Sequence, residues 1–586
     1  MNSIPRPEHP RPQFERDSWI NLNGEWTYEF DFGASGRDAG RELFKSKGFG
    51  GRIVVPFCPE SELSGVGYKD FIRDMWYHRK IAIPSDWAGR RVVIHFGAVD
   101  YECEVYVDGA SVANPHFGGT VSFEFDLTPF VKAGSEHDLV VRVHDDTRSA
   151  QQPGGKQCPD FKSRACHYTR TTGIWQTVWL EAVAPCGLKS AHIIPDLDGA
   201  AFSVAPAFYA VKQGMRFRAT LLAGDAPVAT AEGSALDGVP LVLHIPGEAK
   251  PWSPESPFLY GLKLEVLDPS GAVVDSVRSS AGLRKIHIDG NKFFLNNEPL
   301  YFRLVLDQGF YPDGIWTAPS DAALKRDIEL SMAAGFNGAR LHQKVFEERF
   351  HYWADKLGYL TWGETSSWGC DPNSVLGARN ALSEWAEIVQ RDRNHPSIIA
   401  WTPWNETGDC RDILQHQRVQ IDTYNIAKAI DPTRPVNDAS GYVHALTDLW
   451  TIHNYSRAPE LEKELAEGGE NGVWSAGWYK WATPPYRGQP YVNDEFGGFK
   501  WIPEGRSAYA DNTWGYGNDI PDLETLYKLL SDEVDVMLRT KNMCGWCYTQ
   551  LTDVEQEQNG IYCYDRAPKF DMARIREIFT RRTPSS

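Results

Sequence analysis

The sequence predicts a multidomain fold that combines β and α/β architecture: a jelly-roll sandwich, an immunoglobulin-like sandwich and a carboxyl-terminal (β/α)8 TIM barrel. A length of 586 residues is too great for a single domain. Closely spaced strand patterns fill the first half of the chain, and strand–helix alternation follows from about residue 302. We therefore predict three domains, which cover residues 1–183, 184–283 and 284–586.

Short β-rich runs predict an antiparallel jelly roll in residues 1–183. The run 104–109 ends in the turn dipeptide Asp108-Gly109, and residues 121–127 alternate apolar and polar side chains. A polar loop rich in Gly, Pro and Cys follows at residues 151–170. Because a connection of this length without its own secondary structure is usually functional, we expect the loop to serve the site.

Residues 184–283 form a second strand-rich stretch. The runs 207–211, 215–222 and 262–266 fit an immunoglobulin-like sandwich of roughly 100 residues. No residue pattern in this stretch indicates catalysis, so we expect it to be a spacer.

Strand–helix alternation predicts the barrel. Ser320 caps a helix that ends at Gly335, with Leu324, Ile328 and Met332 four residues apart. The candidate strands are 302–306, 336–340, 359–362, 398–403, 435–438, 449–453, 491–494 and 545–549. Because TIM barrels carry their active sites at the carboxyl ends of the strands, the residues that end these runs are the candidates for function.

The composition excludes several classes of function. The net charge is −18 with no basic stripe, which argues against nucleic acid and anionic membrane surfaces as partners. The amino terminus is polar, and no segment approaches the ~20 apolar residues of a transmembrane helix. The ten cysteines are scattered, and the CxxC spacing from Cys544 to Cys547 has no second pair nearby. We interpret them as buried thiols of a reduced compartment, which predicts a cytoplasmic protein without a zinc or redox centre.

Two of the candidate strands lead into glutamates. The run S-I-I-A-W-T-P-W-N-E ends at Glu406 after the fourth strand, and P-Y-V-N-D-E ends at Glu495 after the seventh. A retaining glycosidase needs two carboxyl groups ~5–5.5 Å apart, one as nucleophile and one as acid/base. We assign Glu406 as the acid/base because burial beside Trp401 and Trp404 would raise its pKa. Glu495 is then the nucleophile.

Four motifs resemble glycoside hydrolase family 2, which contains β-galactosidases, β-glucuronidases, β-mannosidases and some arabinosidases. The amino-terminal domain has M-W-Y-H-R at 75–79 and T-G-I-W-Q-T-V-W-L-E at 172–181. The barrel has R-N-H-P-S at 393–397 and W-N-E at 404–406. The resemblance extends over nearly the whole chain, and it implies that Glu406 is the acid/base and Glu495 the nucleophile.

The same resemblance implies roles for further barrel residues. Asn405 would bind the sugar 2-hydroxyl, and Arg340 would lie beside the nucleophile. Tyr455 would hydrogen-bond to the nucleophile, and Trp546 would form the aromatic platform beneath the sugar. For each of them, a structural role in an ion pair or in core packing is the alternative.

Four positions in the barrel depart from the family pattern. His342 stands two residues after Arg340 rather than three, and Asp307 replaces a His after the first strand; both are candidates for contacts with the sugar. Glu557 and Asn559 occupy the places of the Asn and Lys with which the glucuronidases bind the substrate carboxylate. Because a carboxylate at position 557 would repel a uronate, the sequence disfavours a glucuronidase.

The loop 151–170 lies where the jelly roll of the family closes the end of the site. His167 replaces an Asp that glucuronidases and large galactosidases place six residues before the equivalent of Gly173. We predict that His167, or its neighbours Tyr168 and Arg170, reaches the sugar pocket. The alternative is a surface loop whose polar groups face only water.

Together these features predict a retaining exo-glycosidase that removes a terminal neutral sugar, a β-D-galactoside or an α-L-arabinoside, in pyranose or furanose form. A β-glucuronidase is the alternative substrate class, and a non-catalytic carbohydrate-binding protein is the alternative without chemistry. The large metal-dependent β-galactosidases of the family have two further carboxyl-terminal domains that this sequence lacks, so we expect no essential metal and no cofactor. The expected partner is a carbohydrate substrate, and the sequence leaves homo-oligomer formation open.

Overall fold

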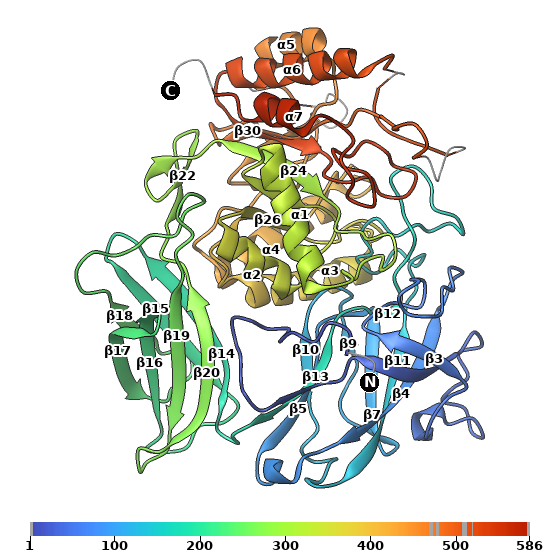
Figure 1. Cartoon of the computed structure of the whole chain (residues 1–586), viewed down its shortest axis with the longest axis vertical. Coiled ribbons are helices and arrows are strands. Elements are labelled where there is room, and N and C mark those ends of the chain that lie inside the picture. The colour runs from blue at the N-terminus through green and yellow to red at the C-terminus, as the bar shows by residue number, and fades with distance from the viewer. Residues whose placement is uncertain are drawn as a thin grey trace.

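The computed structural model describes residues 4–408, 410–467, 473–475, 480–506, 512–517 and 520–582. Two β-sandwiches lie below a barrel in Figure 1: the jelly roll, blue to cyan, at the right and the immunoglobulin-like sandwich, green, at the left. The barrel, yellow to red, lies above both. The predicted fold class, β-sandwiches followed by a parallel β/α barrel, is confirmed.

The jelly roll consists of two antiparallel sheets around one apolar core. Along β11, the alternate residues Leu139, Val141 and Val143 point into this core. The sheets have the strand orders β1-β13-β5-β10 and β3-β2-β4-β11-β7-β8, and β9 pairs with β7. The strands are β1 (Trp19–Asn21), β2 (Gly24–Phe30), β3 (Gly51–Val55), β4 (Asp74–Ala82), β5 (Arg91–Phe96), β6 (Val99–Asp100), β7 (Glu102–Val107), β8 (Ala110–Ser111), β9 (His116–Phe117), β10 (Phe123–Asp126), β11 (Glu136–His144), β12 (Gly173–Ile174) and β13 (Val178–Val183), with short 3-10 helices at Leu43–Lys45 and Ser85–Trp87.

The second sandwich has a three-stranded sheet, β14-β15-β18, and a four-stranded sheet, β17-β16-β19-β20. Residues of both sheets, among them Val204 and Leu264, share one apolar core. Its strands are β14 (Leu188–Asp196), β15 (Ala201–Phe208), β16 (Arg216–Ala223), β17 (Ala226–Ser234), β18 (Leu241–His244), β19 (Tyr260–Leu267) and β20 (Val273–Ala281). A small sheet of β21 (Ile286–Asp289), β22 (Lys292–Leu295) and β23 (Glu298–Pro299) leads into the barrel.

The barrel strands form one parallel sheet in the order β27-β26-β25-β24-β30-β29-β28. They are β24 (Phe302–Asp307), β25 (Gly338–Leu341), β26 (Leu360–Glu364), β27 (Ile398–Thr402), β28 (Trp450–His453), β29 (Tyr491–Gly497) and β30 (Met543–Thr549). The helices are α1 (Asp321–Ala334), α2 (Glu348–Leu357), α3 (Val375–Asp392), α4 (Ile413–Ile430), α5 (Ala458–Glu467), α6 (Leu523–Arg539) and α7 (Met572–Phe579). The parallel order brings the carboxyl ends of all these strands to the same face, where the candidate site lies.

The helix α1 has the predicted ends. The Ser320 hydroxyl accepts a hydrogen bond from the Ala323 N–H at 3.2 Å. Gly335 ends the helix with φ 102°, a conformation that favours glycine. The predicted apolar positions Leu324 and Ile328 are buried against the barrel.

Residues 435–440 stand where the sequence predicted a fifth strand. They pair with β27 through isolated bridges: the Trp401 N–H donates to the Pro435 carbonyl at 3.1 Å, and the Asn437 N–H donates to the Trp401 carbonyl at 2.8 Å. The prediction of a regular strand at 435–438 is therefore wrong. Pro435 has no N–H for a ladder, and the Asp438 carboxylate accepts backbone N–H groups of the turn that follows.

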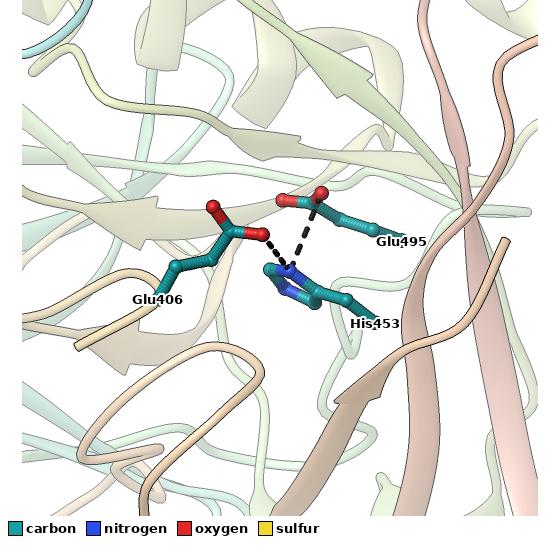
Figure 2. Close-up of side chains that lie close together, drawn as sticks. All are labelled: Glu406, His453 and Glu495. Carbon is teal, nitrogen blue, oxygen red and sulfur yellow. Dashed lines mark hydrogen bonds and ion pairs between the residues drawn. The ribbon is translucent and has the colours of Figure 1, made fainter. Parts of the chain in front are cut away.

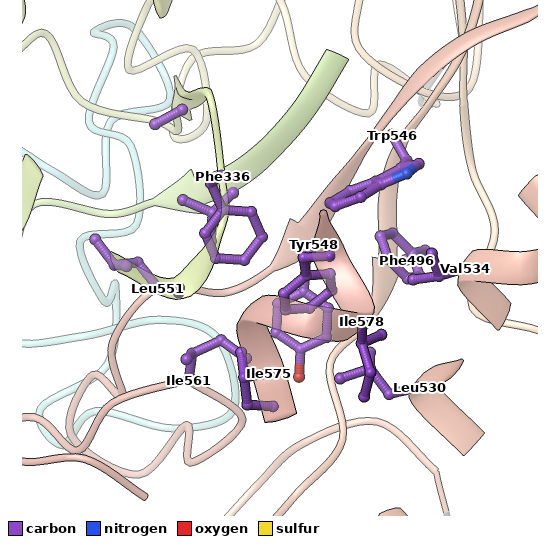
Figure 3. Packing of buried hydrophobic residues seen from close by; sticks show 14 of the residues in the cluster. Phe336, Phe496, Leu530, Val534, Trp546, Tyr548, Leu551, Ile561, Ile575 and Ile578 are labelled. Carbon is purple, nitrogen blue, oxygen red and sulfur yellow. The ribbon is translucent and has the colours of Figure 1, made fainter. Parts of the chain in front are cut away.

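The layer between barrel and helices is built by alternate strand residues. On β30, Trp546 and Tyr548 pack with Phe496 and with side chains of α6 and α7 (Figure 3). Cys547, between them, belongs to the apolar cluster inside the barrel. Trp546 is 0% exposed, so the prediction that it forms a platform beneath the sugar is wrong. The residues of β30 are buried on both faces, and such a strand shows no polar alternation from which its inward face could be predicted.

None of the described helices is long and apolar enough to cross a membrane. All ten cysteines lie among the described residues, and none of them is in a disulfide. Cys544 and Cys547, which form the CxxC spacing, are both buried.

Candidate active site

Three side chains meet at the carboxyl ends of the barrel strands (Figure 2). Glu406 follows β27, His453 ends β28 and Glu495 lies in β29. The His453 Nδ1 atom lies 2.7 Å from Glu406 Oε1 and 3.4 Å from Glu495 Oε2. One oxygen of each carboxylate and a ring nitrogen all lie within 4.8 Å of one another. This arrangement fits the ~5–5.5 Å carboxyl separation of retaining glycosidases better than the ~6.5–9.5 Å of inverting ones.

The backbone at Glu406 is strained. Its φ of 48° lies in the left-handed region, which residues other than glycine rarely adopt and which often marks functional positions. The Glu406 N–H donates to the Ser440 carbonyl at 2.8 Å, and the Asn405 N–H donates to the Ser367 hydroxyl at 3.1 Å. These bonds fix the segment beyond β27 and hold the Glu406 carboxylate opposite Glu495.

Hydrogen-bond donors surround Glu495. The Tyr455 hydroxyl donates to Oε2 at 2.6 Å, and Arg340 Nη2 donates to Oε1 at 3.0 Å. Burial alone would raise the pKa of Glu495, but the charges of His453 and Arg340 lower this pKa below its ordinary value. The predicted contacts of Arg340 and Tyr455 with Glu495 are thus present in the structure. An ionised carboxylate in a fixed orientation is suited to nucleophilic attack.

The environment of Glu406 differs from the predicted one. Trp401 and Trp404 donate their Nε1 hydrogens to side chains of α4 and its carboxyl-terminal cap, on the helix side of the strand. Burial would raise the pKa of Glu406, but the hydrogen bond from His453 and the charges of His453 and Lys156 lower it below its ordinary value. The prediction that apolar burial beside the two tryptophans raises this pKa is therefore wrong.

The pKa of His453 is shifted in the opposite direction to that of Glu406. Burial would lower the pKa of His453, but Glu495, Asp494 and Glu406 raise it above its ordinary value. The second ring nitrogen, Nε2, lies 2.9 Å from the Ser440 hydroxyl, which donates to Asp494 Oδ2 at 2.6 Å. These opposite shifts favour a proton on the imidazole over one on the Glu406 carboxylate, and at this distance the two groups titrate as a coupled pair.

Arg340 connects the nucleophile to other predicted sugar ligands. Its guanidinium donates to Glu364 Oε2 and to Asn405 Oδ1, both at 2.7 Å. Asn405 Nδ2 is buried and has no hydrogen-bond partner in the part of the chain that the structure describes, so it is free to donate to a sugar hydroxyl. His342 Nδ1 lies 2.6 Å from Arg340 Nη2, and burial and the Arg340 charge lower the pKa of His342 well below its ordinary value. His342 is therefore neutral and belongs to the hydrogen-bonded group around Arg340.

Asp307 does not join this group. Its carboxylate accepts the Gly309 N–H at 2.9 Å. Burial and the neighbouring Asp327 of α1 raise the pKa of Asp307 to about 6. Leu304 and Leu306 of the same strand line the barrel interior, so the alternation along β24 directs Asp307 to the helix side. The prediction that Asp307 contacts the sugar is wrong.

The loop 151–170 reaches the barrel mouth from the jelly roll, as the cyan segment beside the red carboxyl-terminal loops in Figure 1. The Tyr168 hydroxyl donates to Glu557 Oε2. His167 stacks on Trp368 with ring centroids 5.3 Å apart, and burial and Lys156 lower the pKa of His167 to about 4. Arg170 donates to backbone carbonyls within and beside the loop, so the prediction that it reaches the pocket is wrong.

Four residues near the two glutamates were not predicted: His453, Glu364, Lys156 and Trp368. His453 and Glu364 each end a barrel strand, a signal that the sequence contains. Trp368 lies beyond β26 and donates to the Asn405 carbonyl at 3.2 Å. Lys156 belongs to the jelly-roll loop, and no local pattern distinguishes it or Trp368 from other loop residues.

Glu406, His453 and Glu495 also form the group of potential metal ligands found among the described residues. Arg340 Nη2 lies 3.0 Å from Glu495 and would repel a divalent cation there. His453 Nδ1 is already engaged by Glu406. The donor set is thus a poor fit to a resident metal, and the expectation of no essential metal stays a prediction.

Comparison with known families gives three matches along the chain. The models for "Glycosyl hydrolases family 2, sugar binding domain", "Glycosyl hydrolases family 2" and "Glycosyl hydrolases family 2, TIM barrel domain" match residues 68–182, 222–284 and 286–581. The last match alone spans just over half of the chain. The chain belongs to glycoside hydrolase family 2. The resemblance carried by the sequence motifs is confirmed, and the protein is a glycoside hydrolase of this family.

Curated members of family 2 match over different lengths. A β-glucuronidase from Paenibacillus borealis is 26% identical over 94% of this chain and 94% of its own length. A β-glucuronidase from Rattus norvegicus is 24% identical over 96% of this chain and 90% of its own length. A β-galactosidase from Thermoanaerobacter pseudethanolicus is 25% identical over 65% of this chain and 50% of its own length.

A solved β-glucuronidase structure shares the fold. The Ruminococcus gnavus β-glucuronidase in complex with D-glucuronic acid superimposes with a TM-score of 0.80. The match covers 98% of this chain and 100% of that one, at 19% sequence identity. At this identity the likeness concerns the arrangement of the three domains.

Proposed function

We propose that this family 2 enzyme is a retaining exo-glycosidase in which Glu495 is the nucleophile and Glu406 the acid/base. The observation that carries the proposal is the placement of the two carboxylates around one imidazole. One oxygen of each carboxylate and a ring nitrogen of His453 all lie within 4.8 Å of one another. Glu495 attacks the anomeric carbon while the glycosidic C–O bond breaks, and the leaving oxygen takes a proton from Glu406. Glu406 then removes a proton from water, which displaces Glu495 from the sugar.

The coupled pair of Glu406 and His453 supplies the proton. Before the substrate binds, this proton lies on His453, whose Nδ1 is 2.7 Å from Glu406 Oε1. When the glycosidic oxygen approaches, Glu406 transfers the proton to the leaving group and is left ionised, ready to act as base in the second step. Ser440 and Asp494 hold the imidazole in place from its other nitrogen.

The jelly-roll loop supports exo action. Tyr168 and His167 contact Glu557 and Trp368 beside the catalytic pair, so the loop forms a wall at one side of the mouth. A wall of this kind blocks continuation of a polysaccharide and selects a terminal sugar. The contact of His167 with the sugar itself stays part of the proposal.

The first substrate candidate is a β-glucuronide. Two of the relatives named above match over at least nine-tenths of this chain and of their own length, and both are β-glucuronidases. A β-D-galactoside is the second candidate, because Glu557 stands where the glucuronidases have an amide and because β-galactosidases match part of the chain. The α-L-arabinoside that the sequence suggested has no support among the relatives named here.

A panel of p-nitrophenyl glycosides tests the proposal, with the anomeric form of the first product followed by NMR. Retention is expected, and Glu495→Ala should abolish turnover. Glu406→Ala should still release good leaving groups, because they need no protonation, and should lose activity on alkyl glycosides. The exposed Glu504→Ala is the matched control. Inversion at the anomeric carbon, or near-wild-type rates in either catalytic variant, would contradict the assignment.

A further inference from the structure

Lys156 is a buried cation that the mechanism above does not use. It lies in the jelly-roll loop and is 6% exposed, and its Nζ lies 3.9 Å from the centre of the Trp368 ring. Within the part of the chain that the structure describes, Nζ has no hydrogen bond and no ion pair. Despite burial, the pKa of Lys156 lies above its ordinary value because of Cys166 and the carboxylates of Glu557, Glu406 and Glu495. Lys156 therefore holds a positive charge over the ring of Trp368, whose Nε1 donates to the carbonyl of Asn405 beside Glu406.

The loop is built to hold Lys156 in this position. The N–H groups of Gly154 and Gly155 donate to carbonyls of the barrel segment that carries Trp368, at 2.8–3.0 Å. Gly155 has φ 60°, and a Cβ there would lie 2.2 Å from the Gln343 carbonyl oxygen, so only glycine fits this approach. On the other side of Lys156, Gln157 donates to the buried Asp100 carboxylate at 2.7 Å. Contacts to both domains thus fix the residues that flank Lys156.

The carboxylates near Lys156 already have partners of their own. Glu557 accepts from Tyr168 and Asn559, Glu406 is bonded to His453, and Glu495 is bonded to Tyr455 and Arg340. The Lys156 ammonium can therefore donate to an entering ligand. A carboxylate on that ligand would accept a charge-assisted hydrogen bond, whereas a hydroxyl would supply only a neutral acceptor.

Building on the proposed function, we infer that Lys156 binds a carboxylate carried by the terminal sugar. The enzyme then hydrolyses uronic acid glycosides and recognises their carboxylate through a residue of the jelly-roll domain. The barrel position where a lysine serves this purpose in the glucuronidases is Asn559 in this chain. The sequence argument against a uronate considered Glu557 alone. In the structure, burial raises the pKa of Glu557 above its ordinary value, while the positive charge of Lys156 acts on the same carboxylate in the opposite direction, so Lys156 offsets part of the repulsion expected from Glu557.

The experiment compares p-nitrophenyl β-D-glucuronide and β-D-galacturonide with p-nitrophenyl β-D-galactoside and β-D-glucoside. Wild type should prefer a uronide. Lys156→Met, which removes the charge and keeps an unbranched side chain, should lower kcat/KM for that uronide by about 10- to 150-fold, the loss expected for a hydrogen bond to a charged group. The loss on the neutral glycosides should be clearly smaller, since there Lys156 acts only through the pKa of Glu406, and Lys156→Arg should restore part of the uronide activity. Lys162→Met removes the same charge from an exposed position of the same loop and should change nothing.

Calorimetry with D-glucuronate and D-galactose gives a readout that does not depend on turnover. Wild type should bind the uronate more tightly, and Lys156→Met should lose this preference. Preference of wild type for the neutral sugars, or an equal loss on both substrate types in Lys156→Met, overturns the inference while leaving retaining hydrolysis intact. If Glu495→Ala remains active, the proposed mechanism fails instead, whatever Lys156 does.

Discussion

Tyr455 tests the role of Glu495 without removing either carboxylate. Replacing Tyr455 with phenylalanine deletes one hydroxyl, which donates to Glu495 Oε2 at 2.6 Å and lies 3.1 Å from Thr549 Oγ1. The ring keeps its stack on Tyr516, with centroids 3.5 Å apart, so we expect the fold to be unchanged. The hydroxyl stabilises Glu495 as an ionised carboxylate, and this stabilisation weakens when the carboxylate becomes a glycosyl ester.

The hydrogen-bond length sets the magnitude. An O–H···O⁻ bond of 2.6 Å is charge-assisted, and the loss of such a bond costs about 1.5–3 kcal/mol, or about 10- to 150-fold in a rate. Because the bond favours departure of the Glu495 carboxylate from the sugar, its loss slows deglycosylation. We expect kcat of Tyr455→Phe to fall by about this factor, and KM to fall as well because the glycosyl-enzyme accumulates.

Stopped-flow kinetics with a p-nitrophenyl glycoside gives the decisive measurement. Tyr455→Phe should show a burst of p-nitrophenol followed by a slow steady state. Tyr424→Phe is the matched control, because it deletes a phenol–carboxylate bond of 2.7 Å between α4 and Asp448, outside the catalytic group. An unchanged kcat, or a lower kcat with neither a burst nor a lower KM, would show that Tyr455 does not act on the nucleophile.

Three further predictions follow from the site and its surroundings. His453→Asn should move the acidic limb of the pH profile of kcat/KM to higher pH. The reason is that the charge of His453 lowers the pKa of Glu495, so removal of this charge lets the pKa of Glu495 rise. His244→Asn, at an exposed position, is the control and should leave the acidic limb unchanged. EDTA should leave activity unchanged, because the Arg340 charge 3.0 Å from Glu495 and the engagement of His453 by Glu406 make the group of Glu406, His453 and Glu495 a poor metal site; activity lost to EDTA and regained with a metal would contradict this. Trp546→Ala should lower Tm, with a cost of about 3–5 kcal/mol for the cavity, and leave KM alone. A raised KM at wild-type Tm would restore Trp546 as a sugar contact.

The domain order and the two glutamates were predicted from local sequence patterns. Runs of alternating residues identify the strands of the sandwiches, and the apolar runs before Glu406 and Glu495 identify two barrel strands. Because a TIM barrel brings all strand ends to one face, two strand-end carboxylates far apart in sequence had to lie near each other. Family membership could be predicted because each family motif is a contiguous stretch of the sequence, which is recognised without knowledge of the fold.

The orientation of individual side chains was decided only by the tertiary structure. Trp546 and Asp307 lie on strands buried on both sides, so no polar alternation shows which face is inward, and both proved to point to the helix layer. The pKa of Glu406 depends on His453, which another strand places 2.7 Å away. Lys156 comes from a different domain altogether. Charge interactions act through space, and burial makes them strong, so the protonation and the charge of the site depend on distances that arise only when the domains pack together.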